Sequence, residues 1–185
     1  FSAVMAQPSP ENLKIAQQLL KSNQKALGYS ANELSESLIK NSYFDNTSKA
    51  QLVYVLQTYK GLPIHNQYEV MAFKNGLLQN RSGNRINMQA RVKPASITPA
   101  VDAKSAISTA LQDRKLPAAK NFNLLSVSED GRTSVFSNLG VSRENVTAEL
   151  MWVADKFGKE VYLAWQVYII PNTNSDYWQI RVDAN

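Results

Sequence analysis

The chain has 185 residues, 44% of them hydrophobic and 19% charged, a composition typical of folded globular proteins rather than disordered ones. It contains no cysteine and a single histidine, His65, which excludes disulfides, thiolate chemistry and any site in this chain that needs two histidines. The net charge of +5 is uneven. Residues 1–120 hold 15 basic and 7 acidic residues, a balance of +8, whereas residues 121–185 hold 5 and 8, a balance of −3. This division favours two parts with different surfaces.

Helix signals dominate the first 40 residues. Ser-Pro-Glu at 9–11 predicts a helix start and Gly28 a helix stop. Ser-Ala-Asn-Glu at 30–33 has the spacing of a capping box and predicts a second helix. The apolar face expected for that helix consists of Leu34, Leu38 and Ile39.

The hydrophobic period then changes to two, which is typical of strands. Strands are predicted at 51–59 and 64–73, separated by the break Lys-Gly-Leu-Pro at 60–63. Asn75-Gly76 is a strong hairpin signal, so a third strand is expected from Leu77 until the chain reaches Gly83.

The second half repeats this order after a segment at 91–100 with two prolines and little periodicity, which predicts a linker. A helix is expected at 101–112 and strands at 150–154, 161–170 and 177–182. Helices followed by runs of strands indicate the α+β class with antiparallel sheets. We therefore expect two small subdomains, 1–90 and 101–185, each with helices packed on an antiparallel sheet.

Self-contained catalytic chemistry finds little support. The sequence has no Walker loop, G-x-G-x-x-G, H-E-x-x-H or G-x-S-x-G motif, and no apolar run approaches the roughly 20 residues of a membrane helix. His65 follows Pro63 at a strand start and is better interpreted as a partly exposed strand-edge histidine than as a catalytic one. We expect no catalytic residue, cofactor or metal ligand in this chain.

Two further patterns admit more than one interpretation. Arg81, Arg85, Arg91 and Lys93 form a loose basic stretch, which predicts a solvated basic face; an acidic protein partner and, less well supported, nucleic acid are the functional alternatives. The three tryptophans recur every 13 residues in predicted strands, a pattern more typical of one core than of a ligand-binding stack. They are Trp152, Trp165 and Trp178.

One segment of the first half is more specific. The stretch at 54–64 contains Gln57, Tyr59, Gly61, Pro63 and a following isoleucine, and resembles the Gln-x-Tyr-x-Gly-hydrophobic-Pro-hydrophobic signature of the fungalysin/thermolysin propeptide domain. The family often has Asn or Asp where this chain has Lys60. Gly61 permits a sharp backbone bend and Pro63 stiffens the exit from it.

The second half resembles a PepSY-like domain. Glu-Leu-Met-Trp-Val at 149–153, Leu-Ala-Trp-Gln-Val at 163–167 and Trp-Gln-Ile-Arg-Val-Asp-Ala at 178–184 are similar to the end of prosegments in secreted zinc endopeptidases of the fungalysin branch. In that family a mature protease follows this point, so the catalytic half is expected beyond Asn185. Phe1 at the start suggests a trimmed chain.

The resemblance implies a non-catalytic prosegment that acts in cis as an inhibitor and folding template for a downstream zinc endopeptidase, its implied partner. It also implies a monomer that is secreted or in the cell envelope, from a bacterial source. The alternative is a free-standing secreted binding or inhibitor module; an enzyme in its own right is a weaker one. The candidate motif or interface residues are Gln57, Tyr59, Gly61, Pro63, Arg81, Arg85, Trp165, Arg181 and Asp183.

Overall fold

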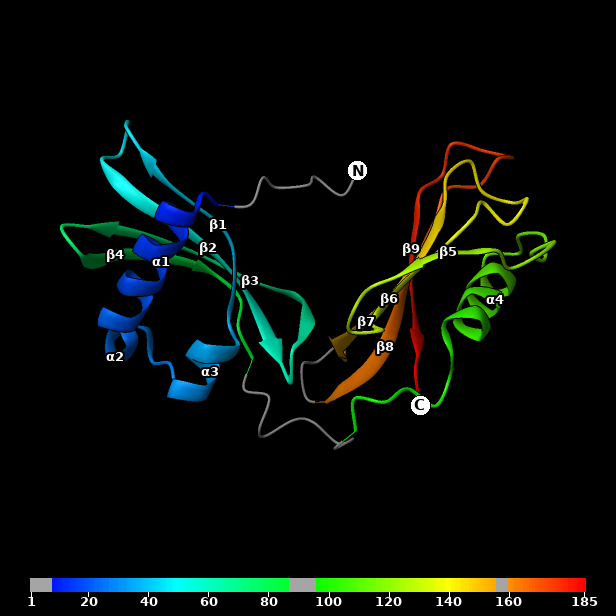
Figure 1. Cartoon of the computed structure of the whole chain (residues 1–185), viewed down its shortest axis with the longest axis horizontal. Coiled ribbons are helices and arrows are strands. Elements are labelled where there is room, and N and C mark those ends of the chain that lie inside the picture. The colour runs from blue at the N-terminus through cyan, green and yellow to red at the C-terminus, as the bar shows by residue number, and fades with distance from the viewer. Residues whose placement is uncertain (1–7, 87–95, 156–159) are drawn as a thin grey trace. The chain divides into compact units, whose positions relative to one another are not determined.

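The computed structural model describes residues 8–86, 96–155 and 160–185 (Figure 1). The chain divides into two compact units, Phe1–Met88 and Gln89–Asn185. Helices and antiparallel strands are present in both units, so the α+β class predicted from the sequence is confirmed. Residues 91–95 of the predicted linker lie outside the described residues.

The first unit opens with two helices where the sequence predicted one. In α1 (Pro10–Ser22) the Ser9 side chain caps the first turn by accepting a hydrogen bond from the Asn12 N–H at 3.2 Å. Asn23 separates α1 from α2 (Gln24–Leu27), and Gly28, with φ of 69°, ends α2 in the left-handed conformation.

Asn23 interrupts the helix because its buried side chain hydrogen-bonds to a distant hairpin. Its amide nitrogen donates to the carbonyl oxygens of Leu19 and Gly76, both at 2.9 Å, and its oxygen accepts from the Leu78 N–H at 3.1 Å. These bonds join the end of α1 to the turn that the Asn75-Gly76 sequence forms.

The second predicted helix is correct at its start and wrong in its length. In α3 (Ala31–Glu36) Ser30 and Glu33 form the expected capping box. The chain then enters the strand β1 (Leu38–Asp45), which places Leu38 and Ile39 in a sheet instead of on a helix. Backbone pairing with residues 50–56 stabilises this strand, and a helix period cannot reveal such a non-local partner.

The first sheet is an antiparallel meander with strands in the order β1-β2-β3-β4. Its other strands are β2 (Ala50–Tyr59), β3 (Leu62–Lys74) and β4 (Leu77–Gly83). Asn75 and Gly76 have φ of 50° and 76°, the left-handed pair that a two-residue hairpin turn needs, so the hairpin prediction is confirmed.

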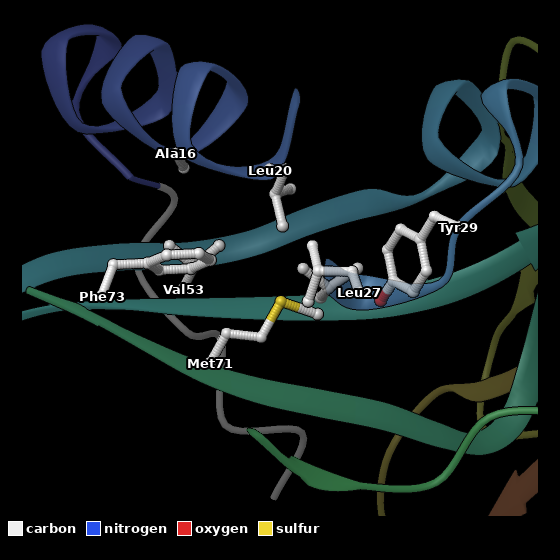
Figure 2. Packing of buried hydrophobic residues seen from close by; sticks show 8 residues of the cluster. Ala16, Leu20, Leu27, Tyr29, Val53, Met71 and Phe73 are labelled. Atoms are coloured by element: carbon white, nitrogen blue, oxygen red, sulfur yellow. The ribbon is translucent and has the colours of Figure 1, made fainter. Parts of the chain in front are cut away.

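Helices cover one face of this sheet, and the core of the first unit lies between them. Figure 2 shows Ala16 and Leu20 of α1 directed toward Val53, Met71 and Phe73 of the central strands. Leu27, Tyr29 and Val55 complete the buried cluster. Alternation along β2 and β3 supplies this face, because residues two apart point to the same side of a strand.

The second unit packs one helix on a five-stranded antiparallel sheet, β5-β6-β7-β8-β9. The helix is α4 (Ala103–Asp113), whose buried face is Ala103, Ala106, Ile107, Ala110 and Leu111. The strands are β5 (Leu124–Val127), β6 (Thr133–Phe136), β7 (Val146–Ala154), β8 (Val161–Ile169) and β9 (Trp178–Asp183). In the described part of the chain, no helix is long and apolar enough to cross a membrane.

The three tryptophans lie on one face of this second sheet. The strand register puts Trp152 opposite Leu163, Trp165 opposite Leu150 and Trp178 opposite Ile169. Trp152 and Trp165 are buried and Trp178 is half-buried, so the first two are core residues, as the sequence predicted.

Candidate functional site

The Gln57-to-Pro63 motif forms the hairpin between β2 and β3, and Gln57 is its buried anchor. The Gln57 side-chain nitrogen donates to the Ile86 carbonyl at 2.6 Å, and the Ile86 N–H donates to the Gln57 side-chain oxygen at 3.0 Å. One N–H and the oxygen of the side-chain amide copy a strand pairing here, which is why this position suits glutamine. Gln57 therefore fixes the point where the chain leaves the first unit's sheet.

Gly61 and Lys60 form the two-residue turn of that hairpin. Lys60 has φ of 50° and Gly61 has φ of 76°, and the flanking residues Tyr59 and Leu62 pair across the ladder. Asparagine and aspartate adopt such a left-handed pair more readily than lysine.

The hairpin tip contacts the end of α3. The Lys60 N–H donates to the Glu36 carboxylate at 3.3 Å, and the Thr58 hydroxyl donates to the Glu36 carbonyl. Tyr59 lies beside Lys60, whose ammonium is 5.6 Å from the ring centre, and half-buried Pro63 pairs with Thr58. These contacts give the motif residues a structural part in holding helix and hairpin together.

A buried carboxylate is the centre of the most polar cluster in the first unit. Glu69 of β3 has a side chain only 3% exposed and points to the helix-covered face. It accepts hydrogen bonds from the Tyr29 hydroxyl and from Arg81, and Arg85 lies 3.6 Å away. Both guanidinium groups also lie over the Tyr29 ring, at 5.3 Å for Arg81 and 4.0 Å for Arg85.

This cluster corrects the interpretation of a solvated basic face for Arg85, whose side chain is 12% exposed, whereas Arg81 is paired but remains exposed. Arg81 also donates to the Leu27 carbonyl at 2.7 Å, and Arg85 pairs with Glu33 at 3.3 Å. The two arginines are engaged within the unit because the buried charge of Glu69 requires compensation. Arg91 and Lys93 lie outside the described residues.

The electrostatics of the cluster follow from burial and hydrogen bonding. Burial, the hydrogen bond to Glu69 and the charge of that carboxylate raise the pKa of the Tyr29 hydroxyl. At Glu33, burial acts to raise the pKa, but hydrogen bonds from Ser30 and the nearby Arg85 charge outweigh it and lower the pKa below its usual value. Tyr29 thus stays protonated and donates its hydrogen bond to Glu69 well above the pH at which a free tyrosine ionises.

Sequence reasoning missed Tyr29 and Glu69, although one signal for Glu69 was present. Glu69, Met71 and Phe73 share the face of β3 that the helices cover. An acid therefore occupies a position where the alternation predicts an apolar residue. Such a break in the alternation indicates either an edge or a buried ion pair. Nothing in the sequence indicates which basic residues approach it.

In the second unit, Trp165 and the last residues form a different anchor. The Trp165 indole N–H donates to the Val101 carbonyl at 2.7 Å, just before α4 begins. Ala184 is fully buried; its N–H donates to Leu163 at 3.0 Å, and its carbonyl accepts from Ala100 at 2.7 Å and Val101 at 3.1 Å. The main chain is therefore held on both sides at Ala184.

Arg181 and Asp183 lie on the exposed face of β9, beside a groove of about 690 Å³ between that strand and α4. The Asp183 carboxylate accepts hydrogen bonds from the Asn185 backbone N–H at 3.0 Å and from its side chain at 3.2 Å. At the other end of the groove, Arg114 stacks 4.7 Å from the Trp178 ring and pairs with Asp113. The structure thus brings three of the predicted residues, Trp165, Arg181 and Asp183, to the C-terminal part of the second unit.

The remaining chemistry of the described residues is sparse. No three His, Asp or Glu side chains within residues 8–86, 96–155 and 160–185 gather as metal ligands would. His65 is half-buried in β3, before the part of that strand that pairs with β4, which begins at Glu69. A comparison of the chain with protein-family models and with curated proteins finds no match.

Proposed function

We propose that this chain is the prosegment of a secreted zinc endopeptidase, which inhibits the attached catalytic domain and serves as a template for its folding. The observation that carries the proposal is the pairing of two sequence motifs with two backbone anchors. The Gln57 motif holds the exit from the first sheet, and the Val-Asp-Ala sequence holds the main chain at Ala184.

A fixed exit matters for inhibition in cis. A covalently attached domain meets its target at an effective concentration near the millimolar range, so even weak docking blocks substrate if the linking chain leaves in a suitable direction. In the proposed precursor, the residues after Ala184 leave from a point that hydrogen bonds and burial hold in place. A rigid, folded unit is also what a folding template requires, because it can stabilise native-like structure late in the folding of a kinetically stable protease.

The proposal does not need the basic stretch to be a docking surface. Arg81 and Arg85 are engaged with Glu69, so electrostatic attraction to an acidic catalytic domain would rest on basic residues scattered elsewhere on the chain. We therefore expect inhibition to depend only weakly on salt between about 50 and 500 mM.

The direct test uses the coding sequence beyond Asn185. If it encodes an H-E-x-x-H zinc peptidase, the isolated chain added to that catalytic domain should inhibit cleavage of a peptide substrate. The matched negative control is the same chain after irreversible heat denaturation, which should not inhibit. A coding sequence that stops at Asn185, or a catalytic domain unaffected by excess chain, would overturn the proposal.

Deletion of residues 177–185 is a poor variant for this test. It removes the whole of β9 and the buried Ala184, so loss of inhibition could not be separated from loss of the fold. Single changes at exposed positions, such as Asn185→Asp, suit this test better than the deletion, because they leave the core of the second unit intact.

A further inference from the structure

The hairpin turn between β3 and β4 contains the only asparagine in the sequence that precedes a glycine, Asn75 before Gly76. Both residues are exposed, and within the described residues no hydrogen bond holds the Asn75 side chain. Glycine leaves its backbone nitrogen unshielded, and a Cβ added to Gly76 would meet no atom within 4 Å. No side chain therefore hinders an attack by the Gly76 nitrogen on the side-chain amide of Asn75.

These two groups react with each other without an enzyme. The Gly76 nitrogen gives up its proton and bonds to the side-chain carbonyl carbon of Asn75, while the bond from that carbon to the side-chain nitrogen breaks. Ammonia leaves and a succinimide ring remains. Water then adds to either carbonyl of the ring and opens it, which gives aspartate or isoaspartate. In isoaspartate the main chain runs through Cβ and Cγ and is longer by one carbon.

The folded turn opposes this reaction. Ring closure needs the Gly76 nitrogen to lie on the same side of the Cα–C′ bond of Asn75 as Cβ. Asn75 has φ of 50°, and left-handed backbone has ψ of about +47°, which turns the Gly76 nitrogen almost opposite to Cβ. The flanking pair, Lys74 and Leu77, fixes this conformation. The reaction therefore requires the turn to open.

A buried side chain at the end of α1 holds the turn closed. Asn23 is 7% exposed; its amide nitrogen donates to the Gly76 carbonyl at 2.9 Å, and its oxygen accepts from the Leu78 N–H at 3.1 Å. Opening the turn deprives this buried amide of both partners, which costs free energy. In the isoaspartate product, the extra carbon displaces the Gly76 carbonyl relative to Leu78, so the two bonds cannot both form again.

We propose that Asn75 is a site of spontaneous deamidation, that the bonds from Asn23 to Gly76 and Leu78 set its rate, and that conversion to isoaspartate releases the hairpin from α1. The change is one-way, because the ammonia is lost. Neither the reaction nor its test involves a protease.

The site is tested on the folded full chain in mildly alkaline buffer, where the backbone amide loses its proton more readily. Tandem mass spectrometry of peptides locates each conversion of amide to acid, and an isoaspartate-specific methyltransferase labels the isoaspartate. It should accumulate faster at Asn75 than at Asn174, another exposed asparagine, which precedes a serine. Accumulation at Asn75 that is no faster than at Asn174 would overturn the inference.

Three variants separate local opening of the turn from unfolding of the whole unit. Asn23→Ala removes both bonds to the hairpin and should speed conversion at Asn75 by about tenfold or more. Asn23→Asp keeps the acceptor for Leu78 but loses the donor for Gly76; it should also speed conversion and replaces Asn23→Ala if that variant does not fold. Gln57→Ala weakens the same unit near the other end of β2 and should stay within about twofold of the parent.

Circular dichroism confirms that each variant is folded. A folded Asn23 variant that converts no faster than the parent would overturn the inference. Equal acceleration by Gln57→Ala would also overturn it, since unfolding of the unit would then set the rate.

The consequence of the reaction is measured at the Leu78 amide. In the isoaspartate form, separated by chromatography, this amide should exchange its hydrogen faster than in the parent, because its bond to Asn23 is lost. Asn75→Asp is the matched control, since it adds the same charge on a normal backbone that suits a left-handed turn; its Leu78 amide should stay protected. Unchanged protection in the isoaspartate form would contradict the release. Loss of protection in Asn75→Asp would contradict it as well, because charge rather than the longer main chain would then be the cause.

Discussion

At the scale of single residues, the contacts of the Gln57-to-Pro63 motif hold parts of the first unit together. Gln57 is buried and bonded to both backbone groups of Ile86, a residue 29 positions away. Only the resemblance to a known motif singled out this glutamine in the sequence. Its partner Ile86 lies beyond the third predicted strand. Its partner could not be predicted from local pattern.

Replacing this glutamine should be costly. In Gln57→Ala, the Ile86 N–H and carbonyl lose their partners inside the unit, so we expect a loss of about 1–3 kcal/mol in the free energy of unfolding. Urea denaturation measures it. Gln79→Ala is the matched control, because Gln79 is an exposed glutamine of the same sheet, and its loss should be below about 0.5 kcal/mol. Equal effects of the two changes would show that the Ile86 bonds contribute nothing.

The Tyr29–Glu69 pair predicts a response to alkaline pH. The pKa of Tyr29 is raised in the native state by burial and by Glu69, whereas an unfolded tyrosine ionises near pH 10. Above that pH the native state binds more protons than the unfolded state, so stability falls as pH rises. The contribution of this one group is up to about 1.4 kcal/mol per pH unit.

Tyr29→Phe tests this linkage. At pH 7 it should cost about 1–3 kcal/mol, since Glu69 loses a buried donor. Tyr54, Tyr168 and Tyr177 also have raised pKa values and are present in both proteins. Between pH 10 and 11 the free energy of unfolding of Tyr29→Phe should therefore still fall, but less steeply than that of the parent. Parallel curves for the two proteins would contradict the assignment.

At the scale of elements, local signals predicted where helices and turns begin but not how far helices extend. The Ser9 cap, the Ser30 capping box, the Asn75-Gly76 hairpin and the Gly28 stop all occur as expected. The errors lie at Asn23 and at Leu38, where a distant hairpin and a neighbouring strand determine the outcome. Contacts between segments far apart in sequence decided both cases.

The β2–β3 turn offers a stabilising change. Lys60 occupies a left-handed conformation that asparagine adopts more readily, so Lys60→Asn should raise the free energy of unfolding by about 0.5–1 kcal/mol. Lys14→Asn, on the exposed side of α1, is the control. It should lower the free energy of unfolding by at most about 0.5 kcal/mol. A Lys60→Asn protein less stable than the parent would argue against this turn geometry.

At the scale of the whole molecule, each unit has its own core, and the tryptophans offer a selective probe. All three tryptophans belong to the second unit, so their fluorescence reports on that unit alone. Gln57→Ala should therefore shift the unfolding of the first unit, followed by tyrosine signals and circular dichroism, and leave the tryptophan transition in place.

The reciprocal change is Trp165→Phe, which removes the bond to the Val101 carbonyl. It should shift the fluorescence transition, with Trp152 as the remaining buried reporter, by about 1 kcal/mol or more. The first unit should be unaffected. If either variant moved both transitions together, the two units would unfold as one cooperative body.

The central claim is that this chain restrains a zinc endopeptidase to which it is attached. The most direct measurement is the activity of the catalytic domain that the proposal expects beyond Asn185, titrated with the folded chain. We predict that activity falls with added chain until a saturating plateau of inhibition is reached. Full activity at every concentration of folded chain, or the absence of such a domain from the gene, would contradict the account.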